Sequence, residues 1–290
     1  MLSILIPTYN YDCQGLVDAL NVQARELGVQ YEIIVFDDTS TERFEFRDCR
    51  VIRSERNVGR AAGRNALARA ARFEYLLYID SDSMPARGDY LRRYVERIER
   101  KLQDAACRVS TPQVLVISGG RVYRKAEDVE HSLLPAYGRR ERVVRECQPM
   151  APFMSPNFLI DRATMLAHPF DESFRGYGHE DTLFGIELML AGIRYTVIDN
   201  PVVHCHIETN AEFLRKNREA LRTLKKMAEG RDGVGCVCTE LRQVSKMVRW
   251  SRFVPFRLPM GLAVLMEKVI LRWPTDRLLQ VYKFLYYNAL

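Results

Sequence analysis

Residues 75–82 read Tyr-Leu-Leu-Tyr-Ile-Asp-Ser-Asp, and this stretch decides the fold that we expect. A short unbroken apolar run is typical of a strand buried on both faces of a sheet. In an extended chain residues i and i+2 point the same way, so Asp80 and Asp82 are predicted to place two carboxylates on one side. Two such carboxylates require a cation, and oxygen ligands favour Mg²⁺ or Mn²⁺ shared with substrate phosphates. Alone, however, an Asp-x-Asp triplet is equally typical of a solvated turn.

Strand-like and helix-like patterns alternate on both sides of this stretch. Further strands are predicted at 3–7, 31–36, 51–53 and 113–117, and helices at 16–27, 61–72 and 90–102. Strands that are apolar on both faces and alternate with helices predict an α/β protein with a mostly parallel central sheet flanked by helices. Ligands of such sheets bind outside the carboxyl ends of the strands.

The second half of the chain is less regular. Strands are predicted at 158–160 and 195–198, helices at 181–191 and 211–229, and loops over the sheet at 120–150. The glycine-rich segment 230–235 is the predicted boundary between a catalytic domain, residues 1–235, and a C-terminal helical extension, residues 236–290.

The net charge of +6 over 290 residues is concentrated in this extension. Residues 241–290 contain nine basic and two acidic residues, a net charge of +7, so residues 1–240 carry −1. The same segment contains both tryptophans of the chain, Trp250 and Trp273. A basic helix with aromatic anchors is typical of peripheral contact with an anionic membrane. The alternatives are a helical element packed on the catalytic domain and a dimerisation element.

The remaining composition excludes several classes of protein. No run of about 18 apolar residues occurs, so no spanning helix is expected, and no secretory signal is recognisable at the amino terminus. Seven scattered cysteines suit a reducing compartment, and we expect a cytoplasmic protein at the inner face of the cell membrane. No P-loop or dinucleotide fingerprint is present, and the basic residues are not interleaved with aromatic ones as in nucleic-acid-binding proteins.

Four blocks of the sequence together resemble family 2 glycosyltransferases with the GT-A fold. The blocks are Ser3–Asn10, Glu32–Ser40, Arg56–Asn65 and Tyr78–Asp82, and the resemblance extends over about residues 1–230. It implies a nucleotide-sugar donor, a divalent metal bound by Asp82 with help from Asp80, and a set of donor-binding residues. These are Pro7, Thr8, Asn10, Asp38, Arg64, Asn65 and Asp80, with Asn157 of the segment Ser155–Phe158 contacting the sugar. The usual Asp-Asp-Gly-Ser reads Asp-Asp-Thr-Ser here.

A second acidic motif follows at residues 176–181, which read Gly-Tyr-Gly-His-Glu-Asp. Acidic residues that open a helix are stabilised as anions, which suits a group that accepts a proton, although such residues are often only helix caps. The motif resembles the Gly-Trp-Gly-Gly-Glu-Asp of galactosyltransferase-type enzymes. That resemblance implies Asp181 as the catalytic base and Glu180 in acceptor binding, with Tyr177 offering a face on which a sugar stacks.

His204 and His206 are candidates for a third metal ligand. Related enzymes supply a histidine from this region, and imidazole is an acceptable donor to Mn²⁺. Both side chains are expected on one face of an extended segment, so the sequence hardly separates them, and His204 is the preferred ligand.

The resemblance predicts an inverting, metal-dependent enzyme of polysaccharide biosynthesis. It would transfer a sugar from a nucleotide-sugar, most simply a UDP-sugar, to a hydroxyl of a glycan or lipid-linked glycan. The alternatives are a non-catalytic module that binds nucleotide-sugars or glycans, and a sugar nucleotidylyltransferase. The latter needs a glycine-rich basic loop after the first strand, which Thr8–Asp12 does not supply.

Overall fold

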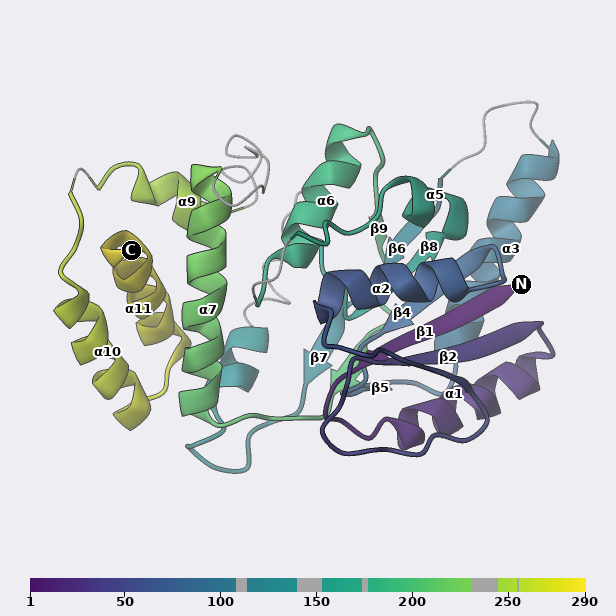
Figure 1. The fold of residues 1–290 in the computed structure, drawn as a ribbon, viewed down its shortest axis with the longest axis horizontal. Helices are drawn as coiled ribbons and strands as arrows, with labels where there is room; N and C mark the ends of the chain where they lie inside the picture. Colours follow the sequence, from purple (N-terminus) through teal and green to yellow (C-terminus); the bar gives the residue numbers. More distant parts are fainter. Residues whose placement is uncertain (108–113, 140–152, 174–176, 231–244, 255) are drawn as a thin grey trace. The chain divides into compact units, whose positions relative to one another are not determined.

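The computed structural model describes residues 1–107, 114–139, 153–173, 177–230, 245–254 and 256–290 (Figure 1). The chain divides into two compact units, and each is considered by itself. Unit 1 comprises Met1–Arg121, Met154–Glu172 and Glu187–Cys205, and unit 2 comprises Val122–Phe153, Ser173–Ile186 and His206–Leu290. The predicted domain boundary at residue 235 lies outside the described residues.

Unit 1 is built on a seven-stranded sheet with the order β3-β2-β1-β4-β8-β6-β9. The strands are β1 (Leu2–Thr8), β2 (Tyr31–Asp37), β3 (Arg50–Arg53), β4 (Tyr75–Ile79), β6 (Val116–Ser118), β8 (Asn157–Asp161) and β9 (Thr196–Val197). Neighbouring strands are parallel except at β8, which runs antiparallel to both β4 and β6. The predicted α/β class with a mostly parallel sheet is therefore confirmed.

Helices cover both faces of this sheet. They are α1 (Gln14–Leu27), α2 (Gly59–Ala70), α3 (Tyr90–Cys107) and α5 (Arg162–Ala167). Figure 1 shows α1 and α2 on opposite sides of β1 and β2. Leu2, Ile4 and Ile6 pack into one core with α1 and α3, while Leu5, which alternation turns to the other face, is also fully buried. Burial on both faces explains the unbroken apolar runs in the sequence.

A smaller sheet begins shortly after β4 in the chain. It consists of β5 (Ser83–Pro85), β10 (Val202–His204) and β7 (Arg121–Tyr123), in the order β5-β10-β7. β5 and β10 are antiparallel, with His204 opposite Ser83. These strands were not predicted from the sequence, because three residues are too few to show a hydrophobic period. The prediction of loops throughout 120–150 is likewise wrong for β7 and for residues 133–139, which are helical.

Unit 2 is helical. It contains the start of α6 (Glu180–Leu190), then α7 (Asn210–Glu229), α9 (Lys246–Ser251), α10 (Met260–Arg272) and α11 (Asp276–Ala289). Helix α7 begins after Thr209, which accepts a hydrogen bond from the backbone N–H of Glu212, and ends at left-handed Gly230. The predicted helices at 181–191 and 211–229 each match within one residue.

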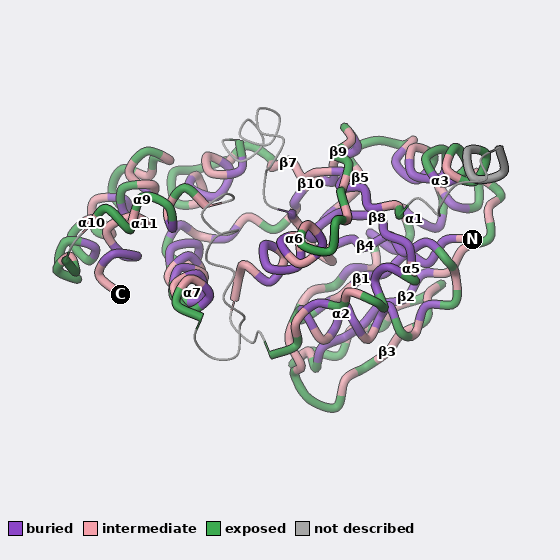
Figure 2. Tube along the Cα trace, turned by 90° about the horizontal axis from the view of Figure 1, so that it is seen from above, coloured by how far each residue is buried: buried purple, intermediate pink, exposed green. Residues whose placement is uncertain are grey.

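The C-terminal helices share one apolar core with α7. Leu221 and Leu224 of α7 are buried with Ile270 of α10 and with Leu279 and Tyr282 of α11. Figure 2 shows buried residues along α7 and α11, and mostly exposed ones along α10. A charged contact joins the same helices, because Arg218 Nη1 donates to Glu267 Oε1 at 2.5 Å. The basic segment is therefore integral to the packing of unit 2.

Candidate active site

The site in unit 1 is centred on Asp82, in the turn between β4 and β5. Asp82 Oδ1 lies 3.3 Å from Nδ1 of His204. Antiparallel pairing of β5 with β10 produces this contact, and the backbone N–H of Cys205 donates to the Asp82 carbonyl at 2.8 Å. His206, two residues further, is exposed and belongs to unit 2. Of the two histidines that the sequence hardly separated, His204 is the one placed beside Asp82.

The Asp82 carboxylate is held in its ionised form. Burial alone would raise its pKa, but the hydrogen bond and charge of His204, together with the positive charges of Arg121 and Arg60, lower the pKa to about 2. Arg60 lies in one of the sequence blocks quoted above, whereas nothing in the sequence pattern pointed to Arg121. The carboxylate is therefore negatively charged throughout the neutral range.

Asp80 has a different partner. The buried Arg64 of α2 donates from Nη2 to Asp80 Oδ1 at 3.0 Å, and its guanidinium lies 5.4 Å from the centroid of the Phe170 ring. The prediction that both carboxylates share one side of an extended strand is wrong. β4 ends at Ile79, and a turn closed by Ser83 N–H and Asp80 C=O at 3.1 Å separates them.

The donor set at Asp82 fits a hard divalent cation. It offers a carboxylate oxygen and an imidazole nitrogen, which are acceptable ligands for Mn²⁺. Within the described ranges, no three His, Cys, Asp or Glu side chains gather into a group able to hold a metal. A cation bound here would therefore take its other ligands from water and from substrate phosphates, as Mg²⁺ commonly does.

The predicted nucleotide-binding residues of β1 lie at its carboxyl end. Pro7 is half-buried, and Thr8 is buried with its hydroxyl donating to the Tyr11 carbonyl at 2.9 Å. Asn10 is exposed and has φ of +53°, a left-handed conformation that asparagine tolerates. Its Oδ1 accepts from the backbone N–H of Thr41 at 2.7 Å, which ties the loop after β1 to the loop after β2.

Asp38 is held by the first turn of α2. Its Oδ1 accepts from the Val58 N–H at 2.7 Å and its Oδ2 from the Gly59 N–H at 2.9 Å. These are N–H groups that a helix cannot satisfy internally. Both oxygens of this buried carboxylate are thus engaged by the protein, and Asp38 fixes α2 and Arg64 at the edge of the site.

We expect Asp38→Ala to lower the free energy of unfolding by about 1–2 kcal/mol, the usual effect of removing a helix cap. Chemical denaturation measures it, with Asp18→Ala, an exposed carboxylate on α1, as the matched control that changes stability by less than about 0.5 kcal/mol. An unchanged stability of Asp38→Ala combined with lost nucleotide binding would mean that Asp38 is a ligand and not a cap.

Asn65 and Asn157 are buried and fully engaged in structural hydrogen bonds. Asn157 Oδ1 accepts from the hydroxyls of Tyr90 and Tyr94, and its amide nitrogen donates to the carbonyls of Gly120 and Asn200. Asn65 bonds both backbone polar groups of Phe170. The polar atoms of both side chains are occupied by other protein groups, which indicates a structural role for Asn65 and Asn157 and not a contact with the donor sugar.

The second acidic motif lies in unit 2, and its Gly176 is outside the described residues. Glu180 and Asp181 open α6. Glu180 is buried, while Asp181 is half-buried and accepts from the backbone N–H of Thr182 at 2.7 Å. Of the two acids, Asp181 is therefore the more accessible to a substrate.

Helix α7 holds this motif in place. The Tyr177 N–H donates to Glu219 Oε1 at 3.3 Å, and Lys216 Nζ lies 5.9 Å from the centroid of the Tyr177 ring. Gly178 has φ of +80°, and a Cβ there would lie 2.8 Å from Cβ of Ala220, so only glycine fits without movement. The backbone conformation and the close approach of α7 thus explain this glycine.

His179 also adopts a left-handed conformation, with φ of +71°, where the galactosyltransferase-type motif has glycine. Burial of the imidazole, helped by the charge of Lys283 and opposed by that of Glu180, lowers the pKa of His179 to about 4. The imidazole is therefore neutral at pH 7, and we assign it no proton transfer.

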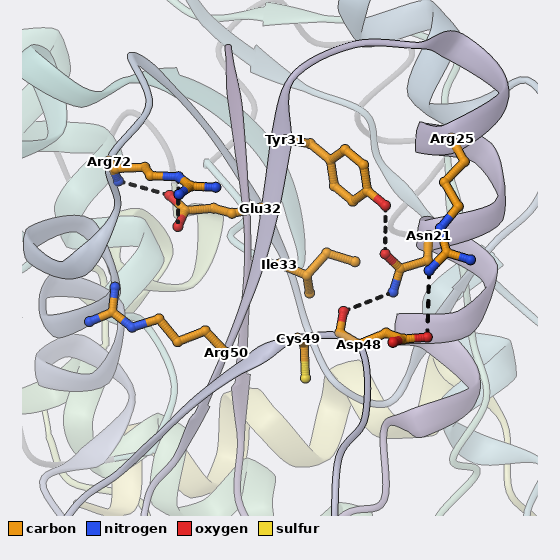
Figure 3. Close-up of a pocket in the computed structure, with 9 residues that line it drawn as sticks. All are labelled: Asn21, Arg25, Tyr31, Glu32, Ile33, Asp48, Cys49, Arg50 and Arg72. Carbon is orange, nitrogen blue, oxygen red and sulfur yellow. Dashed lines mark hydrogen bonds and ion pairs between the residues drawn. The ribbon is translucent and has the colours of Figure 1, made fainter.

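A hollow of about 450 Å³ lies at the opposite edge of the sheet, near the amino ends of β2 and β3 (Figure 3). Figure 3 shows Arg72 paired with Glu32, Arg25 with Asp48, and the Tyr31 hydroxyl with Asn21. Burial raises the pKa of the Cys49 thiol in its wall to about 11, so this thiol is not nucleophilic at neutral pH. Most polar groups of the hollow pair with one another, while Arg50 donates from Nη1 to the Ala70 carbonyl at 3.1 Å, and the hollow is not a candidate for the active site.

Comparison with known proteins assigns the chain to a family of enzymes that transfer sugars. The chain belongs to glycosyl transferase family 2, whose sequence model matches residues 3–163. This match contains all four blocks on which the resemblance was based, and it confirms that resemblance. Residues 3–163 therefore form a glycosyl transferase family 2 region of this chain.

Two curated relatives agree with this assignment. A protein of Haemophilus influenzae described as an uncharacterized glycosyltransferase is 33% identical over 106 residues, covering 33% of this chain and 35% of its own length. The succinoglycan biosynthesis protein ExoO of Rhizobium meliloti is 29% identical over 142 residues, covering 46% of this chain and 39% of its own length. The matches thus span little more than a third of each relative.

Solved structures share the fold. The mannosyltransferase PcManGT of Pyrobaculum calidifontis, in complex with GDP-Man and Mn²⁺, superposes with a TM-score of 0.57 at 14% identity, covering 99% of this chain and 84% of that one. TarS of S. aureus gives a TM-score of 0.51 at 15% identity, covering 99% of this chain and 52% of that one. At these identities the likeness shows the fold alone, and it confirms the predicted GT-A architecture.

Proposed function

We propose that the protein is an inverting, metal-dependent glycosyltransferase that moves a sugar from a UDP-sugar to a hydroxyl of a glycan or lipid-linked glycan. The observation that carries the proposal is the contact between Asp82 and His204, an anionic oxygen and an imidazole nitrogen 3.3 Å apart at the carboxyl end of β4 in a family 2 chain. A solved structure with the same fold supports the proposal, since PcManGT is described with a nucleotide-sugar and Mn²⁺.

In this proposal the donor binds along the carboxyl ends of β1, β2 and β4. Asp82 and His204 would hold Mn²⁺ or Mg²⁺, which when bound offsets the negative charge of the diphosphate leaving group. Arg64 holds Asp80 in place through their ion pair, and Asp38 fixes the helix that carries Arg64. Thr8 and Asn10 shape the loop edge against which the nucleoside would lie.

Asp181 is the proposed base. It accepts the proton of the acceptor hydroxyl while that oxygen forms a bond to the anomeric carbon, and the bond from this carbon to the diphosphate oxygen breaks on the opposite face. The nucleoside diphosphate leaves with the electron pair, and the configuration at the anomeric carbon inverts. Glu180 would contribute to acceptor binding, and the Tyr177 ring would offer a stacking face for a sugar.

We also propose that the enzyme works at the inner face of the cell membrane, where a lipid-linked acceptor would be presented. Over the residues that the structure describes, none of the helices is both long and apolar enough to span a bilayer. The proposed contact is peripheral and is made by the basic C-terminal segment.

A panel of nucleotide-sugars tests the assignment of donor and metal. We expect a UDP-sugar with MnCl₂ to raise the melting temperature by about 5 °C or more at saturating concentration, and EDTA to abolish the rise. GDP-mannose is the matched comparison, because PcManGT is described with that donor. Stabilisation by GDP-mannose alone would refute the choice of uridine, and stabilisation that survives EDTA would refute the metal.

A further inference from the structure

Exposed apolar side chains are concentrated on one part of unit 2. Among the described residues, ten of the eighteen large apolar side chains that are exposed lie between positions 250 and 281. Six of them on α9, α10 and the adjoining turns define what we call the α9–α10 surface: Trp250, Phe253, Phe256, Leu262, Leu265 and Trp273. Large apolar side chains exposed in such numbers along one segment favour an interaction site there.

Helix α10 has a packed side and an open side. Ala263 and Ile270 are buried in the core that α10 shares with α7 and α11. On the other side Leu262 and Leu265 are exposed, together with Lys268 and Arg272. The two leucines are not part of this core, and they remain exposed to water in the described part of the chain.

The aromatic residues of the surface are accompanied by arginines. Trp250 and Phe253 lie with ring centroids 5.8 Å apart, and the Arg252 guanidinium lies 4.6 Å from the Phe253 centroid. Trp250 is 56% exposed and Trp273 61% exposed. Large aromatic rings next to cationic side chains are the residues that anchor proteins at the boundary between lipid headgroups and acyl chains.

The charge of the surface has one sign. From Arg249 to Trp273 the chain contains five basic residues and a single acidic one, Glu267. That carboxylate is paired with Arg218 of α7 and also accepts from the Tyr282 hydroxyl, so it does not neutralise the exposed cations. A second copy of the chain would bring like charges together across a symmetric interface, whereas an anionic surface compensates them.

We infer that the α9–α10 surface docks on a bilayer of anionic phospholipid. The aromatic and leucine side chains enter the headgroup boundary, while Arg252, Arg257, Lys268 and Arg272 contact phosphate groups. Helix α10 has 13 residues, fewer than the roughly 20 that cross a bilayer, so it lies along the membrane plane. The inference deepens the proposed membrane location and does not depend on the proposed chemistry.

Tryptophan fluorescence tests the inference directly, because the chain has only two tryptophans and both lie on this surface. Full-length protein is mixed with vesicles of phosphatidylglycerol and phosphatidylcholine, or of phosphatidylcholine alone. We expect a blue shift and quenching by brominated acyl chains with the anionic vesicles only, weakened by added salt. Binding without any change in emission would overturn the inference, as would a concentration-dependent blue shift without vesicles, which indicates self-association.

Matched variants distinguish the contribution of the α9–α10 surface to vesicle binding from that of charged and apolar residues elsewhere in the protein. Lys268→Glu with Arg272→Glu is expected to weaken vesicle binding at least about tenfold, whereas Arg92→Glu with Arg97→Glu on α3 leaves it within about threefold. Phe253→Gln with Leu265→Gln should reduce it similarly, with Val22→Gln and Val129→Gln as the exposed apolar control. Equal loss in test and control variants would contradict the inference. Nucleotide-sugar binding without vesicles, measured on each variant, reports separately on the proposed function.

Discussion

Replacing Asp181 with asparagine is expected to reduce sugar transfer by about 10²–10⁴-fold, the usual contribution of a general base, and to leave donor affinity within about twofold. Asparagine has the same shape and can still accept the Thr182 N–H, which the Asp181 carboxylate accepts at 2.7 Å. It has no basic oxygen for the acceptor proton. The loss should therefore appear in the rate of the chemical step and not in folding or donor binding.

The measurement is single-turnover transfer, with donor affinity determined by calorimetry on the same preparation. Asp276→Asn is the matched control, because Asp276 is an acid in the first turn of α11, in the same unit. The Asp276→Asn variant should be at least as stable as the Asp181→Asn variant and should keep its sugar-transfer activity. Transfer by Asp181→Asn at the normal rate would remove Asp181 from the role of base.

Replacing Asp82 with alanine is expected to weaken Mn²⁺-dependent donor binding at least about 100-fold. The side chain contributes the carboxylate that lies 3.3 Å from His204, and its low pKa means that a full negative charge is lost at neutral pH. His204→Ala should weaken the metal-dependent part of donor binding in the same direction. Titration of nucleotide-sugar with and without Mn²⁺ separates that part from contacts with the nucleoside.

His206→Ala is the control that the chain itself offers. His206 is two residues away, is exposed, and follows β10 instead of forming part of it. We expect it to retain metal-dependent binding. If His206→Ala loses that binding and His204→Ala keeps it, the pairing of β5 with β10 does not define the metal site.

The strands of the sheet and the helices around it could be predicted from the sequence because short sequence patterns mark where they begin and end. Gly28 and Gly230 end α1 and α7 in left-handed conformations, as glycine after a helical period predicts. The antiparallel direction of β8 could not be predicted from the sequence. Its five residues are buried on both faces, as in a parallel strand, and only its pairing partners β4 and β6 reveal that it is antiparallel.

The candidate site could be predicted from the sequence only in part, because some of its contacts join residues that are far apart in the chain. The motifs located Asp82, but its contact with His204 depends on the pairing of β5 with β10, a strand about 120 residues later in the chain. Asp38 and Asn157 were predicted as donor-binding residues from the family resemblance, and their residue types suit ligand binding. Their actual partners are the first turn of α2 and two tyrosines of α3, which no spacing rule relates to them.

Helix α7 has two occupied sides. One side holds the second acidic motif through Lys216, Glu219 and Ala220, and the other holds the C-terminal helices through Arg218 and Leu221. With the α9–α10 surface resting on lipid, as we infer, this helix would act as a spacer between the bilayer and Asp181. Acceptors would then be selected by the height of their hydroxyl above the membrane: a glycan too short to reach that height, or one long enough to overshoot it, would be a poor substrate whatever its sugar.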